Sequence, residues 1–350
     1  MRVLIYTDNH FSQYSSIVRS RGEKFSTRLE NQIKSINWVE QLAIDEKCEK
    51  IVHLGDFFDK SELNAEELTA LQEIKWADME HVFLVGNHEM GINDLSYSSA
   101  HLFNMVPKAK VIDKVSCDGG FGYELIYLPY ILETNRKPLS EYFKELYQDM
   151  WSTQEVKNRI IFSHNDICGI RYGQWESKAG FDIHDIENSC DLFVNGHLHN
   201  QTQVTKKILN LGNLTGQNFS EDAVKYNHCA AILDIETLKV DLIVNPFAFN
   251  FYQLEVLNRA EFNKLDVCRD QSVISVKTYQ SLVNDLKTSL IGMSNIIAYR
   301  ITTIPEPTKD TKIDNIKDLL KLNHIEQFKQ FIQQNLDNSE ILSEELSYIN

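Results

Sequence analysis

Hydrophobic positions in the first 200 residues alternate between short continuous runs and longer stretches with helical spacing. The continuous runs predict buried strands at residues 3–6, 51–54, 82–85, 159–162 and 192–194. Apolar residues recur every three or four positions in 27–47 and in 61–77, which predicts two amphipathic helices, the second capped by Ser61. This strand–helix–strand alternation predicts a parallel or mixed sheet with helices on both faces.

The pattern becomes richer in strands after residue 205. Runs at 228–235 and 238–244 flank Glu236 and Thr237 and predict a β-hairpin. A strand, a helix and a strand then predict a small βαβ-like unit, at residues 273–277, 279–291 and 296–303. After the linker-like stretch 304–307, apolar residues from Ile313 to Ile332 predict an amphipathic helical tail. The chain thus divides into residues 1–247, 248–304 and 305–350.

Composition is typical of a globular protein, with 43% hydrophobic and 24% charged residues. No apolar run approaches the roughly 18 residues that a membrane span needs, which excludes an integral membrane protein. The first ten residues carry one basic residue and an apolar stretch too short for a secretory signal, so we expect a cytoplasmic location. The six cysteines form no CxxC pair, which indicates reduced thiols rather than a disulfide framework or a thiolate zinc site.

The chain is acidic, with 35 basic and 50 acidic residues and a net charge of −15. Such a charge repels polyanions and argues against a stand-alone DNA-binding module. Residues 17–28 are locally basic and could contact a DNA backbone near the first strand; the cations are Arg19, Arg21, Lys24 and Arg28. A solvated surface loop is the alternative interpretation of this segment.

Residue types that bind metal ions follow each of the five early strands at once. They are Asp8-Asn9-His10, Gly55-Asp56, Gly86-Asn87-His88-Glu89, Ser163-His164 and Gly196-His197-Leu198-His199. Ligands of open α/β sheets gather at the carboxyl ends of the strands, so we expect these side chains to converge. Each motif alone has a structural explanation, such as a helix cap or a core histidine, but five in this order are hard to explain as coincidence.

The donor types indicate the metals and the chemistry. Carboxylate, imidazole and amide oxygen without thiolate suit Mn²⁺, Fe²⁺ or Zn²⁺. The spacings Asp8-x-His10 and His197-x-His199 would place each pair on one side of extended backbone, where each pair could bind one ion. Seven donors exceed one tetrahedral site and fit two ions that share a carboxylate. Two ions about 3.5–4 Å apart suit in-line displacement at phosphorus.

The motifs DNH, GDFFD, GNHE, SH and GHLH resemble, in this order, the five blocks of the calcineurin-like metallophosphoesterase superfamily, over residues 1–245. Within it, the chain looks most like the SbcD-type exonuclease subunits of double-strand-break repair, found in bacteria and phages. GDFFD followed by a helix, the helix at 27–47 and the stretch 209–221 carry this likeness, although Asn213 replaces the usual Ser.

The resemblance implies an α/β fold with a β-sandwich core flanked by helices (α-β-β-α). It also implies a nuclease domain at 1–247, a small α+β capping domain at 248–304 and a helical tail at 305–350. The tail would bind the coiled coil of a partner ATPase, with packing on its own domain as the alternative.

The resemblance also implies roles for the site residues. Asp8, His10, Asp56 and His199 would hold one ion, and Asp56, Asn87, His164 and His197 the other, with Mn²⁺ as the metal. His88 would contact the scissile phosphate and protonate the leaving oxygen. Some relatives carry a histidine where this chain has Asp59, so the resemblance assigns Asp59 no role.

We therefore expect a Mn²⁺-dependent DNA exo/endonuclease subunit that acts with an SbcC-like SMC-type ATPase in recombination and repair. A phosphodiesterase or phosphatase for a nucleotide or other small phosphoester is the alternative, and a non-catalytic scaffold is a third. The Ser/Thr phosphatases share GNHE but carry GDxHG and GDxxDRG in their first two blocks, which this chain lacks. The sequence decides neither between exo- and endonuclease nor whether the chain forms a homodimer.

Overall fold

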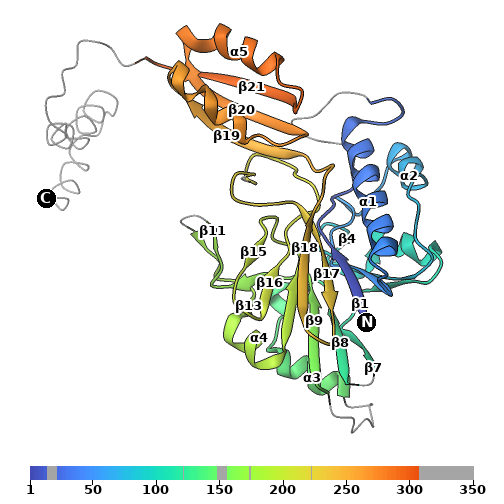
Figure 1. The fold of residues 1–350 in the computed structure, drawn as a ribbon. Helices are drawn as coiled ribbons and strands as arrows, with labels where there is room; N and C mark the ends of the chain where they lie inside the picture. The colour runs from blue at the N-terminus through green and yellow to red at the C-terminus, as the bar shows by residue number, and fades with distance from the viewer. Residues whose placement is uncertain (14–21, 121, 148–155, 173–174, 222, 307–350) are drawn as a thin grey trace, which may run out of the picture. The chain divides into compact units, whose positions relative to one another are not determined.

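The computed structural model describes residues 1–13, 22–120, 122–147, 156–172, 175–221 and 223–306 (Figure 1). Residues 1–304 form one compact unit. Most of the predicted tail, from residue 307 onward, lies outside the described residues.

Two six-stranded mixed sheets form the centre of the fold. In the first, the order of strands is β18 (Lys239–Val244), β17 (Cys229–Asp234), β1 (Arg2–Tyr6), β2 (Lys50–His53), β3 (Glu80–Leu84) and β6 (Ala109–Ile112). In the second, it is β15 (Thr202–Gln203), β16 (Ile208–Asn210), β14 (Leu192–Asn195), β9 (Asn158–Ser163), β8 (Tyr123–Leu128) and β7 (Ser116–Gly120). The pairs β1–β2, β2–β3 and β3–β6 are parallel, as are β8–β9, β9–β14 and β14–β16, and antiparallel strands complete each sheet.

The two sheets pack face to face through a shared hydrophobic core. Alternation along β1 shows this directly, because Val3 and Ile5 enter the core between the sheets whereas Leu4 and Tyr6 pack beneath helices. The second sheet contributes Leu125, Ile160 and other residues to the same core. Burial on both faces explains why these strands have continuous apolar sequences.

Helices cover the outer face of each sheet. Residues of α1 (Thr27–Asp45) share a core with the first sheet and α2 (Ala65–Leu71), and α3 (Leu139–Tyr147) and α4 (Ile183–Ser189) pack on the second sheet. The resulting α-β-β-α layers confirm the predicted fold class (Figure 1). The expectation from periodicity alone, a sheet with helices on both faces, is wrong, since each sheet has helices on one face and the other sheet on the opposite face.

The starts of the two N-terminal helices follow from their caps. Ser26 caps α1 by accepting a hydrogen bond from the N–H of Leu29. Asn64 caps α2 in a capping box, in which Glu67 accepts from the N–H of Asn64 in return. The prediction of a helix at 61–77 with Ser61 as its cap is therefore wrong at both ends.

A smaller sheet follows the sandwich. It contains the parallel strands β19 (Asn250–Val256), β20 (Ser272–Tyr279) and β21 (Ile296–Ile304), with α5 (Val283–Ile291) between the last two. The β20–α5–β21 unit matches the predicted βαβ segment, whereas β19 was not predicted. The β17–β18 hairpin also forms as expected.

Short elements connect these layers. They are β4 (Met90–Gly91), β5 (Asp94–Ser98), β10 (Ile167–Cys168), β11 (Arg171–Tyr172), β12 (Trp175–Glu176), β13 (Phe181–Asp182) and the 3₁₀ segments Ser99–Met105, Glu133–Asn135, Arg259–Val267 and Gln280–Leu282. All six cysteines are free thiols. In the described part of the chain, no helix combines the length and apolarity needed to cross a membrane.

Candidate metal centre

Five strands from both sheets deliver the predicted ligands to one place. The loops after β1, β2 and β3 carry Asp8, His10, Asp56 and Asn87, and those after β9 and β14 carry His164, His197 and His199. Backbone hydrogen bonds continue the strand pairing into these loops, from the N–H of Asp8 to Gly55 O at 3.1 Å and from that of His10 to Asp56 O at 3.0 Å. The convergence expected from the strand-end motifs is therefore present.

Asp8, His10 and His199 form one cluster, with ligand atoms within 4.8 Å of one another. The Nε2 atoms of His10 and His199 lie 3.1 Å apart. His10 Nε2 also lies 4.0 Å from Asp8 Oδ1 and 3.8 Å from Asp56 Oδ2. These donors lie close enough to one another to bind one cation.

Asp56, His164 and His197 form a second cluster on the other side of the Asp56 carboxylate. His164 Nε2 lies 3.1 Å from Asp56 Oδ2. Asn87 Oδ1 completes the cluster at 2.9 Å from His197 Nδ1 and 3.3 Å from His164 Nε2. Since Asp56 Oδ2 faces His10 on one side and His164 on the other, this oxygen is placed to bridge two ions.

The two histidines of GHLH belong to different clusters. His199 lies with Asp8 and His10, whereas His197 lies with Asp56 and His164. The expectation that His197 and His199 bind one ion from extended backbone is therefore wrong. Its premise fails because His197 has a φ of 73°, in the left-handed region.

Four candidate ligands have left-handed backbone, with φ values of 52° at Asp8, 46° at His10, 53° at Asp56 and 73° at His197. Such a conformation costs a non-glycine residue about 1–3 kcal/mol, and residues strained in this way cluster at functional sites. The N–H of His197 donates to both carboxylate oxygens of Asp8, at 3.1 and 3.0 Å, which helps to hold this geometry. The fold thus stabilises strained backbone where the ligands must point inward.

Three further carboxylates orient the imidazoles. Asp59 Oδ1 lies 3.2 Å from His10 Nδ1, Glu221 Oε1 lies 3.0 Å from His199 Nδ1, and Asp166 Oδ1 lies 3.2 Å from His197 Nε2. A carboxylate at one ring nitrogen fixes the proton there and leaves the other nitrogen free for a metal. The sequence motifs give Asp59 no role and do not indicate Asp166 or Glu221, although Glu221 lies in the stretch 209–221.

Glu89 connects the second and third strand-end loops. Its buried carboxylate accepts hydrogen bonds from the N–H groups of Phe57, Phe58 and Gly86, at 2.7, 3.1 and 2.8 Å. Burial, together with the nearby Asp56 carboxylate, raises the pKa of Glu89 to about 7. Glu89 therefore positions the backbone that carries Asp56 and Asn87.

Ionisation in the metal-free chain reflects the proximity of Asp56 and His164. Burial raises the pKa of Asp56, but the attraction and hydrogen bond of His164 outweigh this effect and hold that pKa well below its ordinary value. Burial lowers the pKa of His164, but the Asp56 carboxylate outweighs it and raises this pKa to about 9. A cation that binds His164 must therefore displace a proton.

The residues present fit two divalent cations. A carboxylate lies at Nδ1 of both His10 and His199, so both Nε2 atoms, 3.1 Å apart, are available to bind the same cation. Asp8 and Asp56 are buried carboxylates, which need a charge partner. The first cluster and the second would each hold one ion, with Asp56 shared.

His88 lies at the solvent side of these clusters, with 43% of its side chain exposed. Its ring meets the His10 ring edge-on at 4.5 Å between centroids. Its Nδ1 lies 3.1 Å from the backbone oxygen of Asp59, which fixes a proton on Nδ1 and leaves Nε2 as the nitrogen that gains or loses a proton. His88 also lies within ligand distance of His10 and Asp56, so proximity alone does not separate it from the ligands.

The structure describes two of the four residues that were predicted to contact DNA, Arg28 and Lys24. Arg28 is buried, and its guanidinium donates to the backbone oxygens of Gly216 and Asn9 at 2.6 and 3.3 Å, so the prediction of a DNA contact is wrong for this residue. Lys24 is exposed and forms a surface ion pair with Glu73. Arg19 and Arg21 lie outside the described residues.

The comparisons with known proteins support this description. No curated protein matches the chain significantly. A family model described as calcineurin-like phosphoesterase matches residues 1–201, a range that contains His88 and all seven candidate ligands. Proteins of this family use two divalent metal ions to hydrolyse phosphoesters. Because the match covers more than half of the sequence, the chain belongs to the calcineurin-like phosphoesterase family and is a metal-dependent hydrolase.

Proposed function

We propose that this chain is a Mn²⁺-dependent DNA exo/endonuclease subunit that acts with an SbcC-like SMC-type ATPase in DNA recombination and repair. The observation that carries the proposal is the pair of ligand clusters on either side of the Asp56 carboxylate, with the exposed His88 beside them. An exposed acid next to a dinuclear site is accessible to one phosphodiester of a long polymer.

The stretch that resembles the end of an SbcD-type nuclease core supports a polynucleotide substrate. Within it, Glu221 contacts His199, while Phe219 packs edge-on against Phe251 of β19 with centroids 5.3 Å apart. The guanidinium of Arg300 lies 4.4 Å from the centre of the Phe219 ring. One short segment thus connects the metal centre to the small parallel sheet, which corresponds to the proposed capping domain at 248–304.

The mechanism follows from the roles of the side chains. Two divalent ions at these clusters would supply the positive charge that activates water and stabilises the phosphoryl group. Asp59, Glu221 and Asp166 orient the imidazoles that would hold the ions. In the imidazolium form, His88 Nε2 carries the proton and donates it to the leaving oxygen as the P–O bond breaks.

The net charge of −15 repels the DNA backbone, so DNA binding needs a source of positive charge. Mn²⁺ is the metal that the family resemblance implies, and a donor set of carboxylate and amide oxygens beside imidazoles is consistent with it. DNA affinity would come from these cations and largely from the ATPase partner, for which the amphipathic segment 313–332 is the proposed binding element.

The test uses the purified 350-residue chain with Mn²⁺, alone and with the partner ATPase. Linear duplex DNA, single-stranded DNA and bis-p-nitrophenyl phosphate are the substrates, and Asp56→Asn is the inactive control. We expect cleavage of DNA that EDTA and Asp56→Asn abolish. Turnover of bis-p-nitrophenyl phosphate with every DNA substrate left intact would instead identify a small-phosphoester hydrolase and overturn the proposal.

A further inference from the structure

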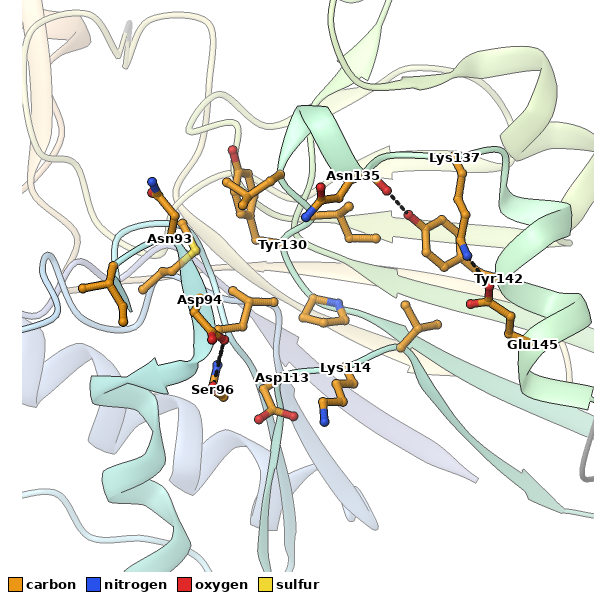
Figure 2. Close-up of a pocket in the computed structure, with 17 residues that line it drawn as sticks. Asn93, Asp94, Ser96, Asp113, Lys114, Tyr130, Asn135, Lys137, Tyr142 and Glu145 are labelled. Carbon is orange, nitrogen blue, oxygen red and sulfur yellow. Dashed lines mark hydrogen bonds and ion pairs between the residues drawn. The ribbon is translucent and has the colours of Figure 1, made fainter.

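A cavity of about 950 Å³ includes in its lining Tyr130, whose ring neighbours that of His197. Figure 2 shows side chains of the β4–β5 hairpin on one side and of residues 129–145 on the other, with Asp113 and Lys114 below them. The volume lies within the range of about 300–1,000 Å³ in which proteins bind organic ligands. The family chemistry described above does not use this cavity.

Tyr130 joins the cavity to the metal centre. It follows β8, and its N–H donates to Val85 O at the end of β3 at 3.0 Å, which fixes its backbone to the first sheet. Its ring lines the cavity and lies 5.8 Å from the ring of His197. A group held on the Tyr130 ring would therefore lie next to the second ligand cluster.

The polar lining suits a neutral heterocycle with an adjacent anionic group. Carboxylates line the cavity, but the structure gives them partners: Asp94 accepts from Ser96, Glu145 pairs with Lys137, and Asp113 lies 3.7 Å from His101. The amides of Asn93 and Asn135 offer both donors and acceptors. Lys114 is exposed at the base and offers a cation.

We propose that this cavity binds a nucleoside of the DNA strand next to the scissile phosphate. Its base stacks on Tyr130, the Asn93 and Asn135 amides face the polar edge of the base, and Lys114 attracts the phosphate of the following nucleotide. Aromatic stacking suits a nuclease of broad sequence range, because every base has a π-face. The inference rests on the proposed function, since it names the part of the substrate that lies beside the proposed nuclease centre.

The test compares substrates that do and do not carry a base. For wild type, Tyr130→Ala, Tyr130→Phe and Lys114→Gln, kcat/KM is measured with Mn²⁺ on a short single-stranded oligonucleotide and on bis-p-nitrophenyl phosphate. The ratio of the two values should fall about 10-fold in Tyr130→Ala, mainly through KM of the oligonucleotide. Tyr130→Phe should restore the ratio, because stacking needs the ring and not the hydroxyl. Lys114→Gln should lower it less and make it less dependent on salt.

Tyr299→Ala serves as the matched control, because Tyr299 is a partly exposed tyrosine of β21 outside this cavity; it should keep the wild-type ratio. If wild type cleaves the oligonucleotide and Tyr130→Ala keeps the wild-type ratio, the nucleoside site is wrong and the nuclease proposal stands. If wild type hydrolyses only bis-p-nitrophenyl phosphate, the nuclease proposal fails and the nucleoside site fails with it.

Discussion

The backbone N–H of His88 donates a hydrogen bond to Asp56 Oδ1 at 2.9 Å, while Asp56 Oδ2 faces His164 Nε2 at 3.1 Å. The proposed general acid and the shared carboxylate are thus held together through the backbone. The side chain of His88 remains exposed, so its chemistry can be removed without disturbing this hydrogen bond.

Replacing His88 by Ala should lower kcat about 10²–10³-fold, because the leaving oxygen loses its proton donor. Metal content, measured by elemental analysis, should remain at two ions per chain, since the backbone N–H that contacts Asp56 is retained. A variant that lost metal and activity together would show that His88 acts as a ligand.

Replacing Glu89 by Ala should lower the free energy of unfolding by about 3 kcal/mol or more, because three buried N–H groups lose their acceptor. Glu89→Gln keeps one acceptor oxygen and should cost less. Urea unfolding of the metal-free proteins measures both, with Glu255→Ala as a surface control expected within about 0.5 kcal/mol of wild type. Equal stability of Glu89→Ala and wild type would contradict the role given to Glu89.

Gly86 leaves room for the shared carboxylate, since a Cβ there would lie 2.1 Å from Asp56 Oδ1. Gly86→Ala should therefore displace Asp56 and weaken Mn²⁺ binding about 10- to 100-fold, as measured by calorimetry. Gly292→Ala is the control, because a Cβ at Gly292 meets its nearest atom at 3.5 Å, an ordinary contact. Unchanged affinity in Gly86→Ala would contradict the position of Asp56.

Mn²⁺ should raise the melting temperature of the wild-type chain by several degrees, and EDTA should reverse the shift. A ligand at 100 times its Kd stabilises the folded state by about 2.7 kcal/mol. Asp56→Asn removes the charge at the shared position and should lose most of the shift. The same shift in both proteins would place the stabilising ion elsewhere.

Metal affinity should rise with pH up to about 9. The pKa of His164 is about 9 in the metal-free chain because the Asp56 carboxylate outweighs burial, so His164 is protonated at pH 7. An ion binds only the neutral ring, so binding releases this proton and affinity increases roughly ten-fold per pH unit below pH 9. Calorimetry in buffers of different ionisation enthalpy counts the released protons, and a count of zero at pH 7 would refute this prediction.

The local pattern of the chain was sufficient to predict the main strands and the convergence of their ends. Buried strands and metal-binding residue types are local signals, and parallel strands bring their carboxyl ends together in space. The same pattern could not show what covers the inner face of a sheet, because Ile5 would be apolar beneath either a helix or a second sheet. That part of the fold followed from the family resemblance.

Contacts between residues far apart in the sequence explain why some site residues were not predicted and why one was predicted wrongly. Asp166 and Glu221 orient ligands only because the fold places them beside His197 and His199, 31 and 22 positions from them. Arg28 was predicted to contact DNA from its charge, but its guanidinium bonds the Gly216 carbonyl 188 positions away. The spacing of residues along the sequence does not reveal such contacts.

Anomalous diffraction at the manganese edge, from crystals grown with Mn²⁺, tests the dinuclear centre most directly. We predict two peaks, one among Asp8, His10 and His199 and one among Asn87, His164 and His197, with Asp56 between them. A single peak, or two peaks that do not both adjoin Asp56, would contradict the account.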